Sequence, residues 1–185
     1  MAFLPIVEES AAKGVAAEVF TAFRRTKGTP FVPNFFKTLA SAPTVAQGTW
    51  NVYRDVGHYG DVPRTIKEML FVAISQARDC KYCEAAHLAI CRLFGIDKET
   101  LETLTRDLAS LKPGRTRDVI RFGVKAALDP QSVSQEDYDV LRRHGLSDAE
   151  IVEVIGMAAF SVYANIVADA TRVEIDPAFE EILKA

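Results

Sequence analysis

Apolar residues recur in this sequence at helical spacing, and no segment shows sustained alternation of apolar and polar residues. In residues 10–28, for example, Val15, Val19 and Phe23 fall on one face of a helix. The dipeptides NG and DG, which mark tight β-hairpins, do not occur. We therefore predict an all-α fold, with one domain over residues 1–185.

Residues with capping properties predict where several helices begin and end. Ser10 is expected to cap the first helix, which ends by Gly28, and Asp61 is expected to cap a helix with Pro63 in its first turn. Gly95 is a suitable stop for the helix before it. A third helix is expected to run out in a loop over residues 57–60. Further helices are expected to start near Pro33, Asp97, Thr116, Ser134, Ser147 and Asp176.

Composition narrows the class of protein. The chain is 49% hydrophobic and 25% charged, with a net charge of -3 and no basic stripe, so we expect no nucleic-acid partner. The N-terminus lacks a basic signal region, and Glu153, Tyr163 and Asn165 interrupt the long apolar stretch 151–168. We expect that stretch to be a buried helix and no membrane to be involved. Three cysteines do not suit a secreted disulfide framework, so a cytoplasmic location is expected.

The segment DCKYCEAAHLAIC, residues 79–91, places Cys80, Cys83, His87 and Cys91 at steps of 3, 4 and 4. This is the spacing of one helical face. A tetrahedral zinc site needs its ligands to converge within ~2.0–2.3 Å of the metal. The ends of one straight helix over residues 80–91 are separated by roughly 16 Å of rise, so these four side chains cannot converge. We expect no metal here, although a site of two or three ligands that includes Glu68 stays open.

Two other interpretations of the segment remain. Cysteine is often a small core residue, which suits Cys91 best. Alternatively, Cys80 and Cys83 can close a disulfide across one helical turn. Cys80 would lie in the first turn, where a helix favours an anion, and Cys83 one turn before His87, within reach for proton transfer.

Glu68 lies in the segment IKEMLFVAIS, in which residues 69–74 are apolar on all sides. A helix of this composition is expected to be buried, and a buried carboxylate needs a partner. The short ARD turn lets this helix pack antiparallel to the cysteine helix. Glu68 is then expected to orient His87. The alternative is that Glu68 lies on a solvated edge with Lys67 and Arg64.

Together these residues read E-x11-C-x2-C-x3-H, which resembles the signature of the AhpD-like alkylhydroperoxidases in the carboxymuconolactone decarboxylase superfamily. Residues 63–87 resemble the core of that family, and residues 146–176 its following long helix. Residues 28–48 are similar to the lead-in of its peroxidase-related subgroup. The resemblance covers most of the chain.

The resemblance implies an AhpD-like domain of several helices, with the CxxC core at about 61–95. It also implies a homo-oligomer, trimeric or hexameric, that contains no cofactor, haem or metal. Cys83 would take the oxygen of an organic hydroperoxide, with His87 and Glu68 relaying the proton. Cys80 would resolve the product and meet a dithiol reductant protein or small thiol; the two cysteines could also exchange roles. One position departs from the family: the best-known members have a histidine where this sequence has Tyr82, and a phenol is not a base near neutral pH.

Two functions of other classes also fit the sequence. The CxxC pair could serve as a structural switch in a redox sensor or helical scaffold without catalysis. Glu68 and His87 could instead act as acid and base in a decarboxylase-like or isomerase-like enzyme.

Overall fold

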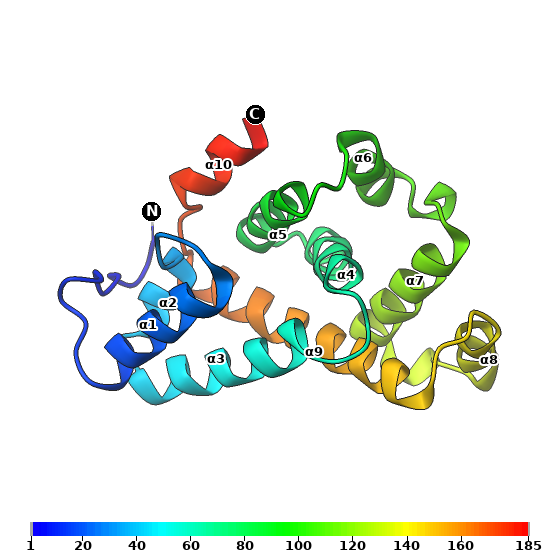
Figure 1. Ribbon diagram of the computed structural model, residues 1–185, viewed down its shortest axis with the longest axis horizontal. Helices are drawn as coiled ribbons and strands as arrows, with labels where there is room; N and C mark the ends of the chain where they lie inside the picture. Colours follow the sequence, from blue (N-terminus) through cyan, green and yellow to red (C-terminus); the bar gives the residue numbers. More distant parts are fainter. Residues whose placement is uncertain (1, 185) are drawn as a thin grey trace.

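The computed structural model describes residues 2–184, which form ten α-helices, two short 3-10 helices and no strand (Figure 1). The predicted all-α fold is confirmed. The helices are α1 (Val15–Lys27), α2 (Asn34–Leu39), α3 (Pro43–His58), α4 (Arg64–Ala77), α5 (Lys81–Leu93), α6 (Lys98–Arg106), α7 (Gly114–Leu128), α8 (Gln135–Arg143), α9 (Asp148–Thr171) and α10 (Pro177–Lys184).

Helix α4 is the centre of the molecule. All ten of its residues from Ile66 to Ser75 are buried, as its apolar sequence predicts. It packs against α5, α7 and α9, and Figure 1 shows these three helices around it. Because only Arg78, Asp79 and the N-cap residue Cys80 separate α4 from α5, the two helices form an antiparallel hairpin.

The N-terminal helices form a separate wall of the molecule. Helices α1 and α3 pack together, α3 lies along α9, and α10 returns to cover α5 (Figure 1). Aromatic rings fill the space inside this wall: Phe23 lies 5.0 Å from Phe36 and 5.4 Å from Trp50 between ring centroids. This wall and α5 therefore face each other, and the site described below lies between them.

Helix α9 is buried on one face only. By length and composition it could cross a membrane, with a mean hydropathy of 1.8, and half of that window is buried inside the protein. Its buried face packs on α3, α4 and α7. The other face exposes apolar residues, so the prediction of a buried helix holds for half of its circumference. The exposed apolar residues are Ala149, Val152, Ala159, Tyr163, Ile166 and Ala170.

Several predicted helix ends are confirmed. Gly28 and Gly95 follow α1 and α5 with φ of 66° and 79°, a region that glycine adopts without strain. Ser134 and Ser147 form complete capping boxes with Asp137 and Glu150. Asp97 caps α6, α10 starts directly after Asp176, and α2 begins directly after Pro33.

Other predicted boundaries are wrong. Helix α1 begins at Val15, not after Ser10, because Glu9 holds the preceding segment by accepting from Arg24 at 2.6 Å and from the Val32 backbone at 3.0 Å. Helix α4 begins at Arg64 after Pro63, and the Asp61 backbone donates to Glu153 instead. Helix α7 begins two residues before Thr116, and His58 is the last residue of α3, not a loop residue.

Lys67, the buried neighbour of Glu68 in the sequence, connects the end of α3 to α9. Its Nζ lies 2.9 Å from the Val56 carbonyl, 2.5 Å from the Tyr59 carbonyl and 2.9 Å from Oε2 of Glu153. The ammonium group thus satisfies carbonyls at the end of α3 and ties them to α9. Lys67 is a structural residue of the α3–α4 connection.

Candidate active site

The α4–α5 hairpin brings Glu68 and His87 together. Nδ1 of His87 lies 2.5 Å from Oε2 of Glu68, and both side chains are buried. The predicted contact between them is present. The alternative, in which Glu68 lies on a solvated edge with Lys67 and Arg64, is wrong, because Glu68 is fully buried.

The carboxylate of Glu68 stays ionised although it is buried. Burial favours the neutral acid, but His87, through its charge and its hydrogen bond, outweighs this together with Lys27 and Arg64, and the pKa of Glu68 is lowered below its usual value. A carboxylate that accepts from Nδ1 leaves Nε2 of His87 as the nitrogen that can take or give a proton. Phe71 fixes the plane of the imidazole by stacking on it, with centroids 3.5 Å apart and an interplanar angle of 12°.

The two cysteines of the CxxC motif have different surroundings. Cys80 is the N-cap residue of α5 and is completely buried, with Sγ 4.0 Å from the Asn165 carbonyl oxygen. A hydrogen bond to Cys83, followed by burial, raises the pKa of the Cys80 thiol well above its usual range. Cys80 therefore keeps its proton.

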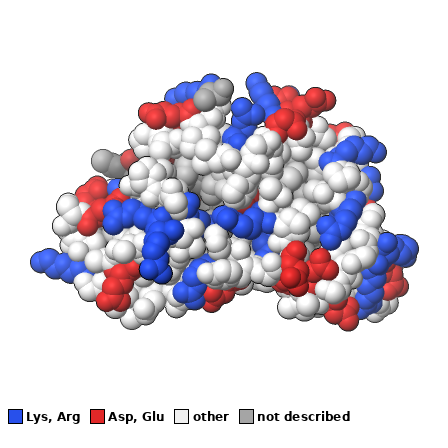
Figure 2. All heavy atoms as spheres, viewed as in Figure 1, with Lys and Arg blue, Asp and Glu red and all other residues white. Residues whose placement is uncertain are grey.

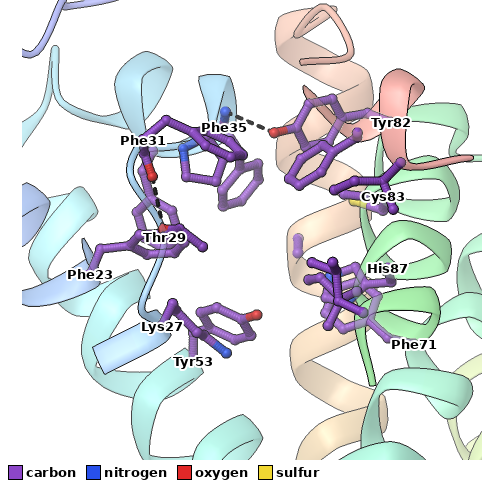
Figure 3. A pocket seen from close by; sticks show the side chains of 18 of the residues that line it. Phe23, Lys27, Thr29, Phe31, Phe35, Tyr53, Phe71, Tyr82, Cys83 and His87 are labelled. Atoms are coloured by element: carbon purple, nitrogen blue, oxygen red, sulfur yellow. Dashed lines mark hydrogen bonds between the residues drawn. The ribbon is translucent and has the colours of Figure 1, made fainter. Parts of the chain in front are cut away.

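A cavity of about 220 Å³ opens beside Cys83 and His87 (Figure 3). In Figure 3 these two side chains and Phe71 lie on one wall, while Phe23, Lys27 and Tyr53 project from the opposite wall. Cys80 does not line the cavity. A small molecule that enters the cavity therefore meets the sulfur of Cys83.

Residues 43–113 match the model of the carboxymuconolactone decarboxylase family, and this stretch contains the whole α4–α5 hairpin. The chain is also similar to a solved peroxidase-related protein from Ralstonia eutropha JMP134 that has an alkylhydroperoxidase AhpD core. That likeness has a TM-score of 0.87 and 25% sequence identity, and it covers 96% of this chain and 94% of the other. This region of the chain belongs to the carboxymuconolactone decarboxylase family, and the whole chain has the AhpD-like fold.

Two further solved structures share the AhpD-like fold. A peroxidase-related protein from Silicibacter sp. TM1040 has a TM-score of 0.85 at 23% identity, over 96% of this chain and 93% of that one. The debrominase Bmp8, in complex with 2,3,4-tribromopyrrole, has a TM-score of 0.83 at 18% identity, over 100% of this chain and 97% of that one. A search of the curated proteins finds none that matches.

Tyr82, at the position where the best-known AhpD-like proteins have histidine, forms hydrogen bonds that connect α5 to other parts of the fold. Its hydroxyl lies 2.9 Å from Oδ2 of Asp176 and accepts from the Phe35 backbone at 3.1 Å. Burial raises the pKa of Tyr82 well above its usual value, so the phenol remains protonated. Oδ1 of Asp176 in turn accepts from the Asn34 backbone at 2.9 Å. Tyr82 thus joins α5 to α2 and to the start of α10.

The structure also adds residues to the AhpD-like site that sequence analysis missed. Phe71 and Tyr53 border His87, and Lys27 and Arg64 line the cavity. Phe71 lies three residues after Glu68, so helical spacing could have placed it on the same face. No comparable signal links Lys27 to the motif, because α1 meets α5 only through the tertiary fold.

Cys91, the third cysteine, lies outside the cavity lining and is completely buried, as the core interpretation predicts. Burial raises the pKa of its thiol, so it is held in the unreactive form. Within residues 2–184, no three His, Cys, Asp or Glu side chains are placed to hold one metal ion.

Proposed function

We propose that this protein reduces organic hydroperoxides with the Cys80–Cys83 dithiol, and that a dithiol reductant protein or small thiol regenerates it. The position of Cys83 carries the proposal. Its sulfur lines an apolar cavity, lies three residues after the buried thiol of Cys80, and lies one helical turn from an imidazole that a carboxylate orients. This arrangement has a nucleophile, a base and a residue that orients the base.

The first step forms a sulfenic acid. His87 takes the proton of the Cys83 thiol on Nε2, and the thiolate attacks the terminal oxygen of the hydroperoxide. The O–O bond breaks, and the departing alkoxide takes the proton back from His87 as an alcohol. Glu68 stabilises the imidazolium between the two transfers. Cys83 is thereby oxidised by two electrons and the hydroperoxide is reduced by two.

The second step forms the disulfide. The sulfur of Cys80 attacks the sulfur of the Cys83 sulfenic acid, the S–O bond breaks, and the proton of Cys80 leaves with the hydroxyl as water. The position of Cys80 at the N-cap of α5, three residues before Cys83, supports this step, because it places the resolving thiol one helical turn from its target. A dithiol reductant then returns both cysteines to thiols and is itself oxidised to a disulfide.

The test is turnover of cumene hydroperoxide with dithiothreitol, followed by peptide mapping after a single oxidation without reductant. We expect turnover, one Cys80–Cys83 disulfide, and Cys91 as a free thiol. Cys83→Ser should abolish turnover, whereas Cys91→Ser is the matched control and should retain it. A disulfide that contained Cys91, or turnover by Cys83→Ser, would contradict the proposal.

The same measurements separate the other functions. A redox sensor or scaffold would form the disulfide but show no multiple turnover. An acid–base enzyme that uses Glu68 and His87 would keep its activity in Cys80→Ser and Cys83→Ser. The proposed peroxidase needs both cysteines and both members of the Glu68–His87 pair.

A second candidate reaction is reductive dehalogenation of an aromatic ring, because the cavity walls carry several aromatic side chains and the similar fold of Bmp8 belongs to a debrominase. Cys83 would take the halogen as a sulfenyl halide while His87 protonates the ring carbon. Cys80 would then displace halide to form the same disulfide. Release of bromide from a bromopyrrole in the presence of dithiothreitol, without hydroperoxide turnover, would favour this reaction.

A further inference from the structure

The cavity has a cationic side, and the proposed redox chemistry uses its charge only to help keep Glu68 ionised. Lys27, the last residue of α1, and Arg64, the first residue of α4, both line it. No Asp or Glu is among the described residues of the lining. The side chains that line the cavity therefore carry an excess of positive charge. Over the face drawn in Figure 2, by contrast, basic and acidic side chains are interspersed.

The ammonium group of Lys27 is buried without a hydrogen-bond acceptor among the described residues. It lies over the ring of Tyr53, 4.0 Å from the centroid, on the wall opposite Cys83 and His87 (Figure 3). Burial lowers the pKa of Lys27 to about 8, although the charge of Glu68 opposes this. Near pH 7 the group is still mostly protonated, so it is a buried cation with three donors and only a ring face for a partner.

Arg64 and Glu68 do not remove this excess charge. Nε of Arg64 is buried without a hydrogen-bond partner, and its guanidinium group lies over the Phe94 ring at 4.9 Å. Glu68 is bonded to His87 through Oε2, and within the described residues neither Lys27 nor Arg64 forms an ion pair with it. A third basic residue is close: burial first, then the charges of Arg64 and Lys27, lower the pKa of His58.

We propose that Lys27 and Arg64 form a subsite for the carboxylate of an amphipathic substrate, whose apolar body lies between the aromatic walls and whose reacting group reaches Cys83. This inference rests on the proposed hydroperoxide reduction and names its substrate class: organic hydroperoxides that carry a carboxylate at the other end of the chain. A carboxylate supplies the acceptor that Lys27 lacks, and hydrogen bonds between charged groups are the stronger kind.

Two inert probes test the subsite without any redox step. Octanoate and octanol share the same apolar chain, and only octanoate carries an anion at pH 7. Isothermal titration calorimetry of the reduced protein should give octanoate binding about tenfold or more tighter than octanol, because the carboxylate pairs with a desolvated cation. In Lys27→Met the octanoate preference should be lost while octanol still binds.

Arg25→Met is the matched control, since Arg25 is an exposed cation on the same helix and lies outside the cavity lining. It should keep the octanoate preference of the wild-type protein. Lys27→Gln, with circular dichroism as a check of folding, replaces Lys27→Met if the latter does not fold. Equal binding of the two probes to the wild-type protein, no binding of either, or an unchanged preference in the Lys27 variant would overturn the subsite.

A second measurement keeps the two proposals distinguishable. The ratio of kcat/KM for a hydroperoxide with a terminal carboxylate to that for neutral cumene hydroperoxide should fall about tenfold in Lys27→Met, mostly through KM. If octanoate is preferred but neither hydroperoxide is turned over, the subsite stands and hydroperoxide reduction fails. If both hydroperoxides are reduced equally well by both proteins, the reduction stands and the subsite fails.

Discussion

The hydroxyl group of Tyr82 lies 2.9 Å from Oδ2 of Asp176, although the two residues are 94 positions apart. Tyr82 stands between the two cysteines of the motif, and Asp176 directly precedes α10, whose side chains Phe179 and Ile182 line the cavity. The hydrogen bond therefore links the start of α5 to the helix that covers it.

We predict that Tyr82→Phe lowers the free energy of unfolding by about 1–3 kcal/mol, because it leaves the buried Asp176 carboxylate and the Phe35 backbone N–H without this partner. The pH dependence of alkylation at Cys83 should not change, since the phenol is not a base. Urea denaturation and alkylation read by mass spectrometry give both quantities. Tyr138→Phe is the control, since Tyr138 is only partly buried and packs on Phe122. A changed alkylation profile in Tyr82→Phe would show that the phenol takes part in proton transfer.

The relay predicts how the reactive thiol responds to its neighbours. Glu68→Gln should raise the pH at which Cys83 is alkylated, because a neutral amide no longer stabilises the imidazolium that pairs with the thiolate. His87→Ala should lower kcat/KM for hydroperoxide by about 100-fold or more, and the double variant should be little worse than His87→Ala alone.

The control for these variants is His144→Ala, which removes another carboxylate-bonded histidine, 2.9 Å from Asp118 and outside the cavity. It should leave alkylation and turnover unchanged. If Glu68→Gln left the alkylation profiles of both cysteines unmoved, the carboxylate would be structural and the relay would be wrong.

The pKa of Lys27 predicts a pH dependence of stability. Its pKa is about 8 in the folded protein and 10.5 in the unfolded chain, so the unfolded chain binds more protons between these values. The free energy of unfolding should therefore contain a term that rises with pH from about 8 to 10.5, on the order of a few kcal/mol in total. Lys27→Met should flatten this rise, and Lys98→Met, which removes an exposed ammonium, should not. Chemical denaturation at a series of pH values measures the difference between variants, and identical slopes in all three proteins would refute the prediction.

The exposed face of α9 predicts self-association. Its apolar residues include Val152, exposed by 66%, and Ile166, exposed by 54%, and they form one stripe along the helix. A stripe of this kind is suited to packing against a second copy. Light scattering should give a mass that is a multiple of 20.4 kDa, and Val152→Lys with Ile166→Lys should give a monomer. Asp169→Lys changes charge on the same helix and should leave the mass unchanged. A monomer at micromolar concentration in the wild-type protein would argue against the interface.

Most of the helices and the contact between Glu68 and His87 were predictable from the sequence, because both depend on local spacing. Two neighbouring helices and a short turn place Glu68 and His87. The burial of Glu68 follows from the apolar residues 69–74 beside it, and its proximity to His87 follows from the short turn between the helices. Lys27 could not be placed, because its distance from the cavity depends on how α1 packs across the fold. The caps at Ser10 and Asp61 also depend on distant contacts: Glu9, the neighbour of Ser10, accepts from the Val32 backbone, and the distant carboxylate of Glu153 accepts from the Asp61 backbone.

The turn between α4 and α5 fixes where α5 begins, so the place of His87 depends on the number of residues that follow the turn. Asp79 adopts a φ of 59°, the Cys80 backbone donates back to Ser75 at 2.9 Å, and α5 starts at a fixed point beside α4. One residue added between Cys80 and His87 would turn the imidazole by about 100° around the helix axis and advance it by about 1.5 Å. A contact of 2.5 Å has no tolerance for such a displacement. The number of residues from the turn to the histidine is therefore as much a part of the site as the side chains, and changes in chain length can be accommodated in the outer loops but not within this interval.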